Sequence, residues 1–263
     1  MVTGLLDTPF FHGIPQRDLD IRQYRAKVPM FFAGARVMGG IFAVDLEAAR
    51  RLLPDPRFEV ATAYPGRALL GIFAFDYGYT DLGPYKEAFV SLSIHFGRSP
   101  VPHPLRVANG LLRRTFDGHT IQLPVDSDAA RVGGIDLFGV PKYLAGLTFA
   151  DEQNERVCRV CDERGASVFT LRCPRPTLRT AGRFSPLREQ TFRNYAVTER
   201  GIAVGRFVLH APLAGMAVGP RSAVLEPGAS MRGEELGELH VAHALGSFVG
   251  ENCEAILHAP TYL

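Results

Sequence analysis

The chain has 263 residues, of which 46% are hydrophobic and 21% are charged. These proportions are ordinary for a globular protein, and the length suffices for one large β-rich domain or two small ones. The net charge is +2 and no basic run extends beyond Arg113-Arg114, so neither nucleic acid nor a membrane surface is an expected partner.

The sequence also gives an expectation for the cellular compartment of the protein. Residues 1–30 hold no basic start followed by an apolar stretch, so no secretion signal is visible. The longest apolar region, residues 30–44, contains Arg36 and several glycines and is too short and interrupted to span a bilayer. Four cysteines do not make a disulfide framework in a chain of this length. We expect a soluble, cytoplasmic protein.

The first predicted elements are an arm, a strand and a helix. Residues 1–29 are loop-like and contain several prolines, so we expect an N-terminal arm. Residues 36–44 are typical of a strand in which two adjacent glycines allow a bulge or a close backbone approach. Asp45 is a suitable N-cap for a short helix that Pro54 ends.

A series of short strands follows. Residues 69–77 and 88–96 are bounded by turn residues, and the turn between them presents Tyr85 and Glu87. Both alternating faces of the first of these strands are apolar, so it is expected to be central. Further strands are predicted over residues 119–125, 143–149, 156–161, 167–171, 205–210, 238–245 and 254–258.

Two later regions do not follow this series clearly. Residues 172–187 are rich in Pro, Arg, Thr and Gly and are expected to form an exposed excursion. Residues 233–250 fit a helix as well as a strand. Many short strands with one or two short helices predict a mainly β fold, a barrel or a sandwich, and we expect residues 1–263 to form a single domain.

Lys142 is the first candidate functional residue. It follows Pro141 within an apolar stretch that holds almost no other charge. Burial on an apolar wall favours the free amine over the ammonium, and a free amine can form a Schiff base with a ketone. The alternative is a lysine whose stem lies on the wall while its head reaches water.

Other candidate motifs are weak. Cys158 and Cys161 lack the second pair that a zinc site needs, and residues three apart face opposite sides of a strand. His240 and His243 have the same weakness. We predict no metal and no cofactor.

Two segments resemble the acetoacetate decarboxylase superfamily. Residues 134–142 read Gly-Ile-Asp-Leu-Phe-Gly-Val-Pro-Lys and resemble the family's active-site segment, in which a Gly-Arg-Glu precedes Pro-Lys-Lys. Residues 81–87 read Asp-Leu-Gly-Pro-Tyr-Lys-Glu and resemble its Gly-Leu-Gly-x-Tyr-x-Glu loop. Residues 45–54 and 219–221 agree in order with further family segments.

This resemblance implies a fold and a site. The fold is a closed, cone-like antiparallel β-barrel with a few short helices, and the protein is a homo-oligomer acting on a small keto acid. Lys142 forms the imine, and Glu87 orients the substrate or carries protons. The residues implied or considered for substrate binding are Arg36, Tyr85, Gln122 and Tyr143. Gln122 also fits a surface-facing position, and Tyr143 a packing role.

The sequence departs from the family pattern at several positions. Tyr143 stands where the family has its second lysine, and Ile135 and Asp136 replace its arginine and glutamate. A second pocket carboxylate falls on Ile72, and Arg36 is one position away from a family arginine. The imine-forming amine is thus kept without its neighbouring ammonium.

Three functions follow from this pattern. The first is a Schiff-base lyase that decarboxylates a β-keto acid. The second is an aldolase–dehydratase that acts on an α-keto acid such as pyruvate through the same lysine. The third is a non-catalytic small-molecule binding protein on the same fold.

Overall fold

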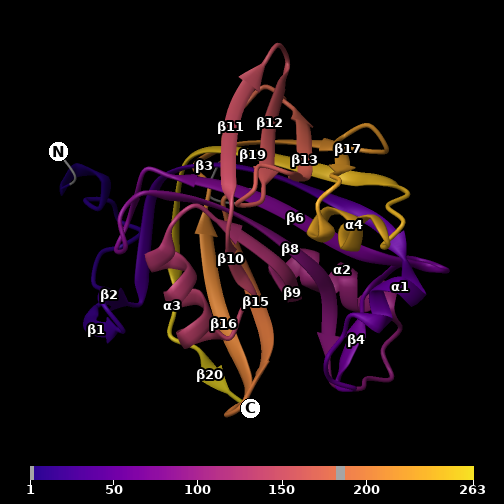
Figure 1. Cartoon of the computed structure of the whole chain (residues 1–263), viewed down its shortest axis with the longest axis horizontal. Helices are drawn as coiled ribbons and strands as arrows, with labels where there is room; N and C mark the ends of the chain where they lie inside the picture. The colour runs from indigo at the N-terminus through magenta and orange to yellow at the C-terminus, as the bar shows by residue number, and fades with distance from the viewer. Residues whose placement is uncertain (1–2, 182–186) are drawn as a thin grey trace.

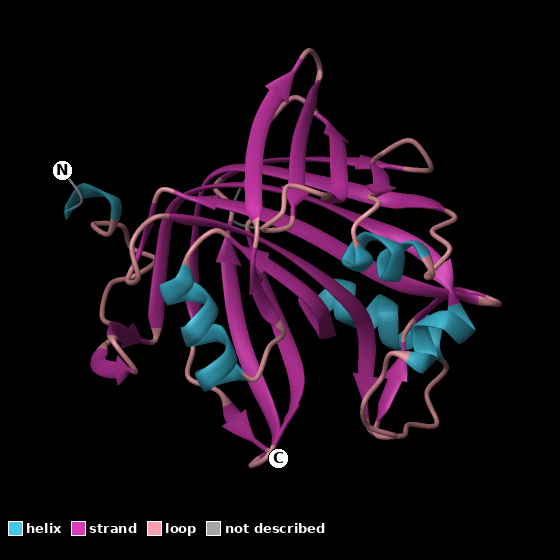
Figure 2. Cartoon of the chain, viewed as in Figure 1, coloured by secondary structure: helices cyan, strands magenta, loops and turns pink. Residues whose placement is uncertain are grey.

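The computed structural model of the chain describes residues 3–181 and 187–263, most of which lie in strands (Figures 1 and 2). Residues 1–2 of the expected arm and residues 182–186 of the expected excursion lie outside the described residues. The helices are η1 (Thr3–Leu5), α1 (Leu46–Arg51), α2 (His103–Arg113), α3 (Asp128–Phe138) and α4 (Met231–Gly237).

The strands of the main sheet are β3 (Met30–Asp45), β4 (Phe58–Val60), β5 (Thr62–Tyr64), β6 (Arg67–Tyr77), β7 (Tyr79–Thr80), β8 (Tyr85–Phe96), β9 (Thr115–Val125), β10 (Lys142–Leu144), β14 (Arg179–Thr180), β15 (Glu189–Thr198), β16 (Gly201–His210), β17 (Leu213–Val218), β19 (His243–Leu257) and β20 (Thr261–Tyr262). A second sheet contains β11 (Gly146–Glu152), β12 (Glu155–Cys161), β13 (Ser167–Pro174) and β18 (Val224–Pro227). A separate hairpin contains β1 (Arg17–Ile21) and β2 (Tyr24–Val28).

Seven strands of the main sheet close into a ring. Their order is β3, β6, β8, β9, β15, β16 and β19, and β19 pairs in turn with β3. Closure removes the exposed edges that an open sheet would leave. The expected closed β architecture is therefore confirmed. One junction differs from the expected antiparallel pairing, because β9 and β15 run parallel.

Aromatic side chains fill the interior of the ring. The ring centroids of Phe75 on β6 and Phe207 on β16 are 5.8 Å apart, although these strands are not neighbours in the sheet. Phe73 on β6 and Phe192 on β15 make a similar contact at 5.8 Å. Such edge-to-face pairs stabilise an interior beyond the area that they bury.

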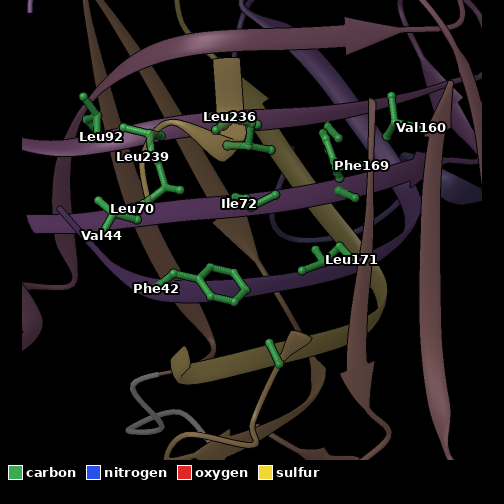
Figure 3. Close-up of a cluster of buried hydrophobic side chains, with 14 of the residues drawn as sticks. Phe42, Val44, Leu70, Ile72, Leu92, Val160, Phe169, Leu171, Leu236 and Leu239 are labelled. Carbon is green, nitrogen blue, oxygen red and sulfur yellow. The ribbon is translucent and has the colours of Figure 1, made fainter. Parts of the chain in front are cut away.

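A second core covers the outer face of the ring. Here Phe42, Leu70 and Ile72 pack against Phe169 and Leu171 of the four-stranded sheet and against Leu236 of α4 (Figure 3). Strand β6 therefore contributes alternate residues to two cores. This confirms that both of its faces are buried, as its sequence predicted.

Several local signals are also confirmed. The Asp45 side chain accepts a hydrogen bond of 2.8 Å from the backbone N–H of Ala48 and caps α1. Gly39 lies against the ring of Phe73, as expected for a close backbone approach. A β-carbon at position 39 would lie 2.1 Å from Phe73 Cδ1.

We expect Gly39→Ala to lower the free energy of unfolding by about 1–3 kcal/mol, because the added methyl overpacks the ring interior. Gly146→Ala is the control, since a β-carbon there would lie 3.9 Å from the Cys161 carbonyl oxygen. Chemical denaturation measures both variants. Equal stability of the two would contradict the close packing at Gly39.

The structure differs from the predicted elements in several regions. The expected strand 143–149 is broken at Ala145, whose N–H donates to the Val125 carbonyl oxygen at 2.9 Å. The expected strand 238–245 is wrong over most of its length, because it follows α4 as a loop and β19 begins only at His243. Helices α2 and α3 and strands β1 and β2 were not predicted, because prolines and glycines in or beside them indicate turns. Strand β15 was not predicted either.

Among the described residues, no helix is both long enough and apolar enough to cross a membrane.

Candidate active site

Lys142 and Glu87 form an ion pair within the ring. The Lys142 Nζ lies 2.8 Å from Glu87 Oε2, and each side chain is 10% exposed. Glu87 pairs in register with Phe75 and Val125 and therefore shares the inner face of the sheet with these core residues. A charged pair this well buried needs further hydrogen bonds to offset its lost hydration.

Two tyrosines supply part of that environment. The Tyr77 hydroxyl donates to Glu87 Oε1 at 2.8 Å, and Lys142 Nζ lies 5.5 Å from the centroid of the Tyr85 ring. Burial, and then the charge of Glu87, raises the pKa of Tyr77 and of Tyr85 well above the usual value. Both phenols therefore keep their protons at neutral pH, and the Tyr77 hydroxyl acts toward Glu87 as a donor.

The local sequence directs Lys142 into this environment. Helix α3 ends at Gly139, whose φ of +63° favours glycine, and Pro141 then leads into β10. Strand β10 runs parallel to β9, with Lys142 opposite Leu123 of the inner face. The lysine stem crosses α3 at Gly134, where an added β-carbon would lie 2.3 Å from Lys142 Cδ.

Arg36 lies on the other face of the sheet. It pairs with Asp76 at 2.5 Å, and its guanidinium lies 5.8 Å from the centroid of Phe149 in the outer sheet. Its neighbour Val37 belongs to the inner core, so alternation turns Arg36 outward. The structure does not bring Arg36 to Lys142.

Gln122 and Tyr143 also lie on the outer face, where they contact each other. The Tyr143 hydroxyl donates to Gln122 Oε1 at 3.3 Å, and the Gln122 amide donates to the Arg232 carbonyl oxygen at 2.9 Å. The Arg232 guanidinium covers the Tyr143 ring at 3.9 Å from its centroid. Gln122 is 3% exposed, so its surface-facing alternative is wrong. These contacts give both residues a packing role beside α4.

The residues at positions that depart from the family pattern lie away from the lysine pair. Ile135 is 39% exposed, and Asp136 forms a bidentate ion pair with Arg22 at 2.6 and 2.8 Å. Ile72 is fully buried in the outer core. None of the three contacts the lysine pair in the described part of the chain.

The sequence prediction missed Tyr77 and Gly134. Tyr77 shares the alternating face of Phe73 and Phe75, so extending that pattern to the end of β6 places it in the ring. Its approach to Glu87 depends on strand register, because Tyr77 lies opposite Tyr85, two residues before the carboxylate. No pattern in the sequence identifies Gly134 as the residue beneath the lysine stem.

We expect Tyr77→Phe to lower the free energy of unfolding by about 1.5–3 kcal/mol, because Glu87 Oε1 loses a donor in a buried setting. Tyr79→Phe is a matched control, since its hydroxyl donates to Asp81 at 3.2 Å in a less buried position. Thermal or urea unfolding compares the two. The same stability loss in both variants would argue against a special contribution of the buried hydrogen bond.

Within residues 3–181 and 187–263, no group of three or more His, Cys, Asp or Glu side chains is placed to hold a metal ion.

The arrangement combines a primary amine, a carboxylate and two phenols on the inner face of a closed sheet. An amine can attack a carbonyl carbon, and an adjacent carboxylate can accept and return protons. The fold and this group define a class of protein, a closed β-ring with a buried lysine–carboxylate pair.

Comparison with known proteins gives the family. The family model "Acetoacetate decarboxylase (ADC)" matches residues 20–190. The chain belongs to the acetoacetate decarboxylase family. A search of curated protein sequences finds no match.

Solved structures show the same fold at low sequence identity. A structure titled as an acetoacetate decarboxylase from Legionella pneumophila subsp. pneumophila str. Philadelphia 1 is 14% identical, with a TM-score of 0.64, covering 100% of this chain and 94% of that one. A structure titled "Structural Studies of Acetoacetate Decarboxylase" is 15% identical, with a TM-score of 0.62 and 89% coverage of both chains. The enduracididine biosynthesis enzyme MppR, solved with pyruvate, is 15% identical, with a TM-score of 0.61 and coverage of 97% and 94%.

Proposed function

We propose that the protein is a Schiff-base-forming lyase that acts on a small keto acid through Lys142. The observation that carries the proposal is the buried contact of 2.8 Å between Lys142 Nζ and Glu87 Oε2, on the inner face of the ring. Membership of the acetoacetate decarboxylase family supports the same class of activity. Tyr85, which lies under the lysine head, belongs to this proposed site.

The proposed reaction begins with proton transfer from the Lys142 ammonium to Glu87. The free amine then adds to the ketone carbon, and the carbinolamine hydroxyl leaves as water after protonation by Glu87. In a β-keto acid, the bond to the carboxyl carbon breaks and its electron pair moves toward the iminium nitrogen. Carbon dioxide leaves, the enamine carbon takes up a proton, and water hydrolyses the resulting imine to release the ketone and the lysine.

A second candidate is aldolase–dehydratase chemistry on an α-keto acid. The described contacts of Lys142 Nζ are the Glu87 carboxylate and the Tyr85 ring. Tyr143, which stands where the family has its second lysine, faces the outer core. Neither of these described contacts of Lys142 is the adjacent ammonium on which the decarboxylase pattern depends. In addition, MppR has been solved with the condensation product of pyruvate and imidazole 4-carboxaldehyde, at 15% identity and a TM-score of 0.63.

Reductive trapping tests the proposal and separates its two versions. The chain has only three lysines, Lys27, Lys86 and Lys142, so peptide mass spectrometry can assign any adduct. With acetoacetate and borohydride, decarboxylation leaves an isopropyl group on Lys142, whereas an imine that keeps its carboxyl leaves a carboxylated adduct. With pyruvate, the expected product is a carboxyethyl group.

The other two lysines are internal controls for trapping. Lys27 is exposed and Lys86 is partly exposed with Asp126 at 3.5 Å, so nonspecific reaction would label them first. Adducts confined to Lys142 support the proposal. Labelling of Lys27 and Lys86 without Lys142 would favour the non-catalytic binding protein, in which Lys142 stays paired with Glu87 or with a ligand carboxylate.

The expectation of a cytoplasmic homo-oligomer stays a prediction, and analytical ultracentrifugation tests the subunit number.

A further inference from the structure

Helix α2 presents its apolar side to the outside of the protein. Leu105 is 61% exposed, Leu111 is 59% exposed and Leu112 is 83% exposed, and Val101 just before the helix is 45% exposed. None of the eleven residues of α2 is buried. A helix on a globular surface ordinarily turns this side toward the core.

The side of α2 that faces the protein is the more polar one. Its inward residues recur at helical spacing and include His103 and Arg106. Arg106 donates to Glu59 at 2.8 Å and to the Gly97 carbonyl oxygen at 3.3 Å. These contacts hold the helix with its leucines outward, so the exposure of the leucines is built into the packing of α2.

The charged residues of α2 and its flanking segments are all positive. Residues 98–116 contain four arginines and no aspartate or glutamate. Arg98 and Arg113 are exposed, and among the described residues neither has a carboxylate partner. The overall charge of +2 conceals this local excess.

The carboxylates of neighbouring elements offset only part of this excess, because two of them already pair with arginines outside residues 98–116. Asp55 pairs with Arg57 at 2.8 Å, and Asp117 pairs with Arg193 at 2.6 Å. Glu59 is the partner of Arg106 at 2.8 Å. The exposed leucines therefore lie in a surface that is basic overall.

We propose that α2 is a membrane-surface helix that docks the protein on an anionic lipid bilayer. Leucines on one side and arginines at the margins are typical of helices that lie in the plane of the lipid headgroups. Eleven helical residues extend about 16 Å, which is far short of the hydrocarbon thickness of about 30 Å, so the helix lies on the bilayer and does not cross it. From the sequence no membrane partner is expected, and the proposal departs from that expectation for this surface.

A second copy of the chain fits the surface less well. A symmetric contact through α2 would bring together two segments, residues 98–116 of each copy, that each carry four arginines and no acidic residue. Phosphatidylserine headgroups complement the same arginines. Figure 1 places α2 well away from α3, so the proposal does not depend on the lysine pair or on its chemistry.

Vesicle co-sedimentation of the full chain tests the proposal. We expect binding to phosphatidylcholine vesicles that contain about 30% phosphatidylserine to exceed binding to pure phosphatidylcholine vesicles by about fivefold or more, and to fall as salt is added. We expect Leu112→Glu to weaken this binding by about tenfold or more, because the leucine loses its burial in the acyl boundary. Arg113→Glu is expected to act in the same direction.

Val218→Glu is the matched control. Val218 is 81% exposed on β17, almost as much as Leu112, but it lies outside α2. Its binding should equal that of the unchanged protein. No binding of the unchanged protein to the anionic vesicles, or equal losses in Leu112→Glu and Val218→Glu, would overturn the proposal. So would a dimer that Leu112→Glu dissociates in the absence of any vesicle binding.

Discussion

Replacing Lys142 by Met should abolish reductive trapping and lower kcat/KM by about ten-thousandfold or more, the scale expected when a covalent nucleophile is lost. The methionine is similar in length but cannot form an imine. The measurement pairs adduct mass with steady-state turnover of the keto acid that traps most efficiently. A variant that retains turnover within about tenfold would show that Lys142 is not the nucleophile.

The same substitution should also lower the free energy of unfolding. Removing Lys142 leaves Glu87 as a buried charge without its ion-pair partner, and such losses cost about 3–5 kcal/mol. The stability loss must therefore be separated from the loss of chemistry. Activity is compared only at a temperature where near-UV circular dichroism shows the variant to be folded.

Lys86→Met is the control for Lys142→Met. Lys86 is next to Glu87 in the chain, but its side chain is 32% exposed and its pairing distance to Asp126 is 3.5 Å. An exposed, long ion pair contributes about 0–1 kcal/mol, so little change in stability is expected. Turnover and trapping should remain close to those of the unchanged protein.

Replacing Glu87 by Gln should slow imine formation, because the proposed reaction uses Glu87 both to take the lysine proton and to protonate the carbinolamine hydroxyl. The amide keeps the size of the side chain but cannot take a proton from the lysine. We expect both the rate of adduct formation at Lys142 and kcat to fall by about 100- to 1,000-fold, within the range of general acid–base contributions. Stopped-flow kinetics and trapping yield measure the two effects on one sample.

Asp76→Asn is the matched control for Glu87→Gln. Asp76 lies on β6, one residue after Phe75, which is the residue opposite Glu87 in the sheet. Its side chain faces outward and pairs with Arg36. Its loss should leave kcat within about twofold of the unchanged protein. Equal losses of kcat in both variants would indicate that the Glu87 effect comes from general disruption of the sheet.

The sequence predicts the architecture well where the signal is local. Alternation along residues 69–77 identifies a strand buried on both sides, and the Asp45 cap identifies α1. The resemblance of residues 81–87 and 134–142 brings Lys142 and Glu87 together across 55 positions of chain. Each of these inferences depends on a pattern within one segment or on two recognised segments.

The sequence predicts less where the outcome depends on pairing between distant strands. Arg36 lies one position from a family arginine, and Tyr143 stands at the position of the family's second lysine. Strand alternation turns both side chains toward the outer core. Tyr77 reaches Glu87 only because β6 and β8 pair in one particular register. The parallel contact of β9 with β15 likewise has no local signature, since it joins segments that are far apart in the chain.

Ring closure has a consequence for how the protein is made. Strand β3 cannot complete its pairing until β19 has been synthesised. The pairing of Met30 with Leu257 joins residues that are separated by almost the whole length of the chain. During synthesis, at about 5–20 residues per second, β3 therefore spends at least about ten seconds outside the ribosome with one edge unpaired. A nascent chain of this kind benefits from a chaperone that shields its apolar strands until the last one emerges.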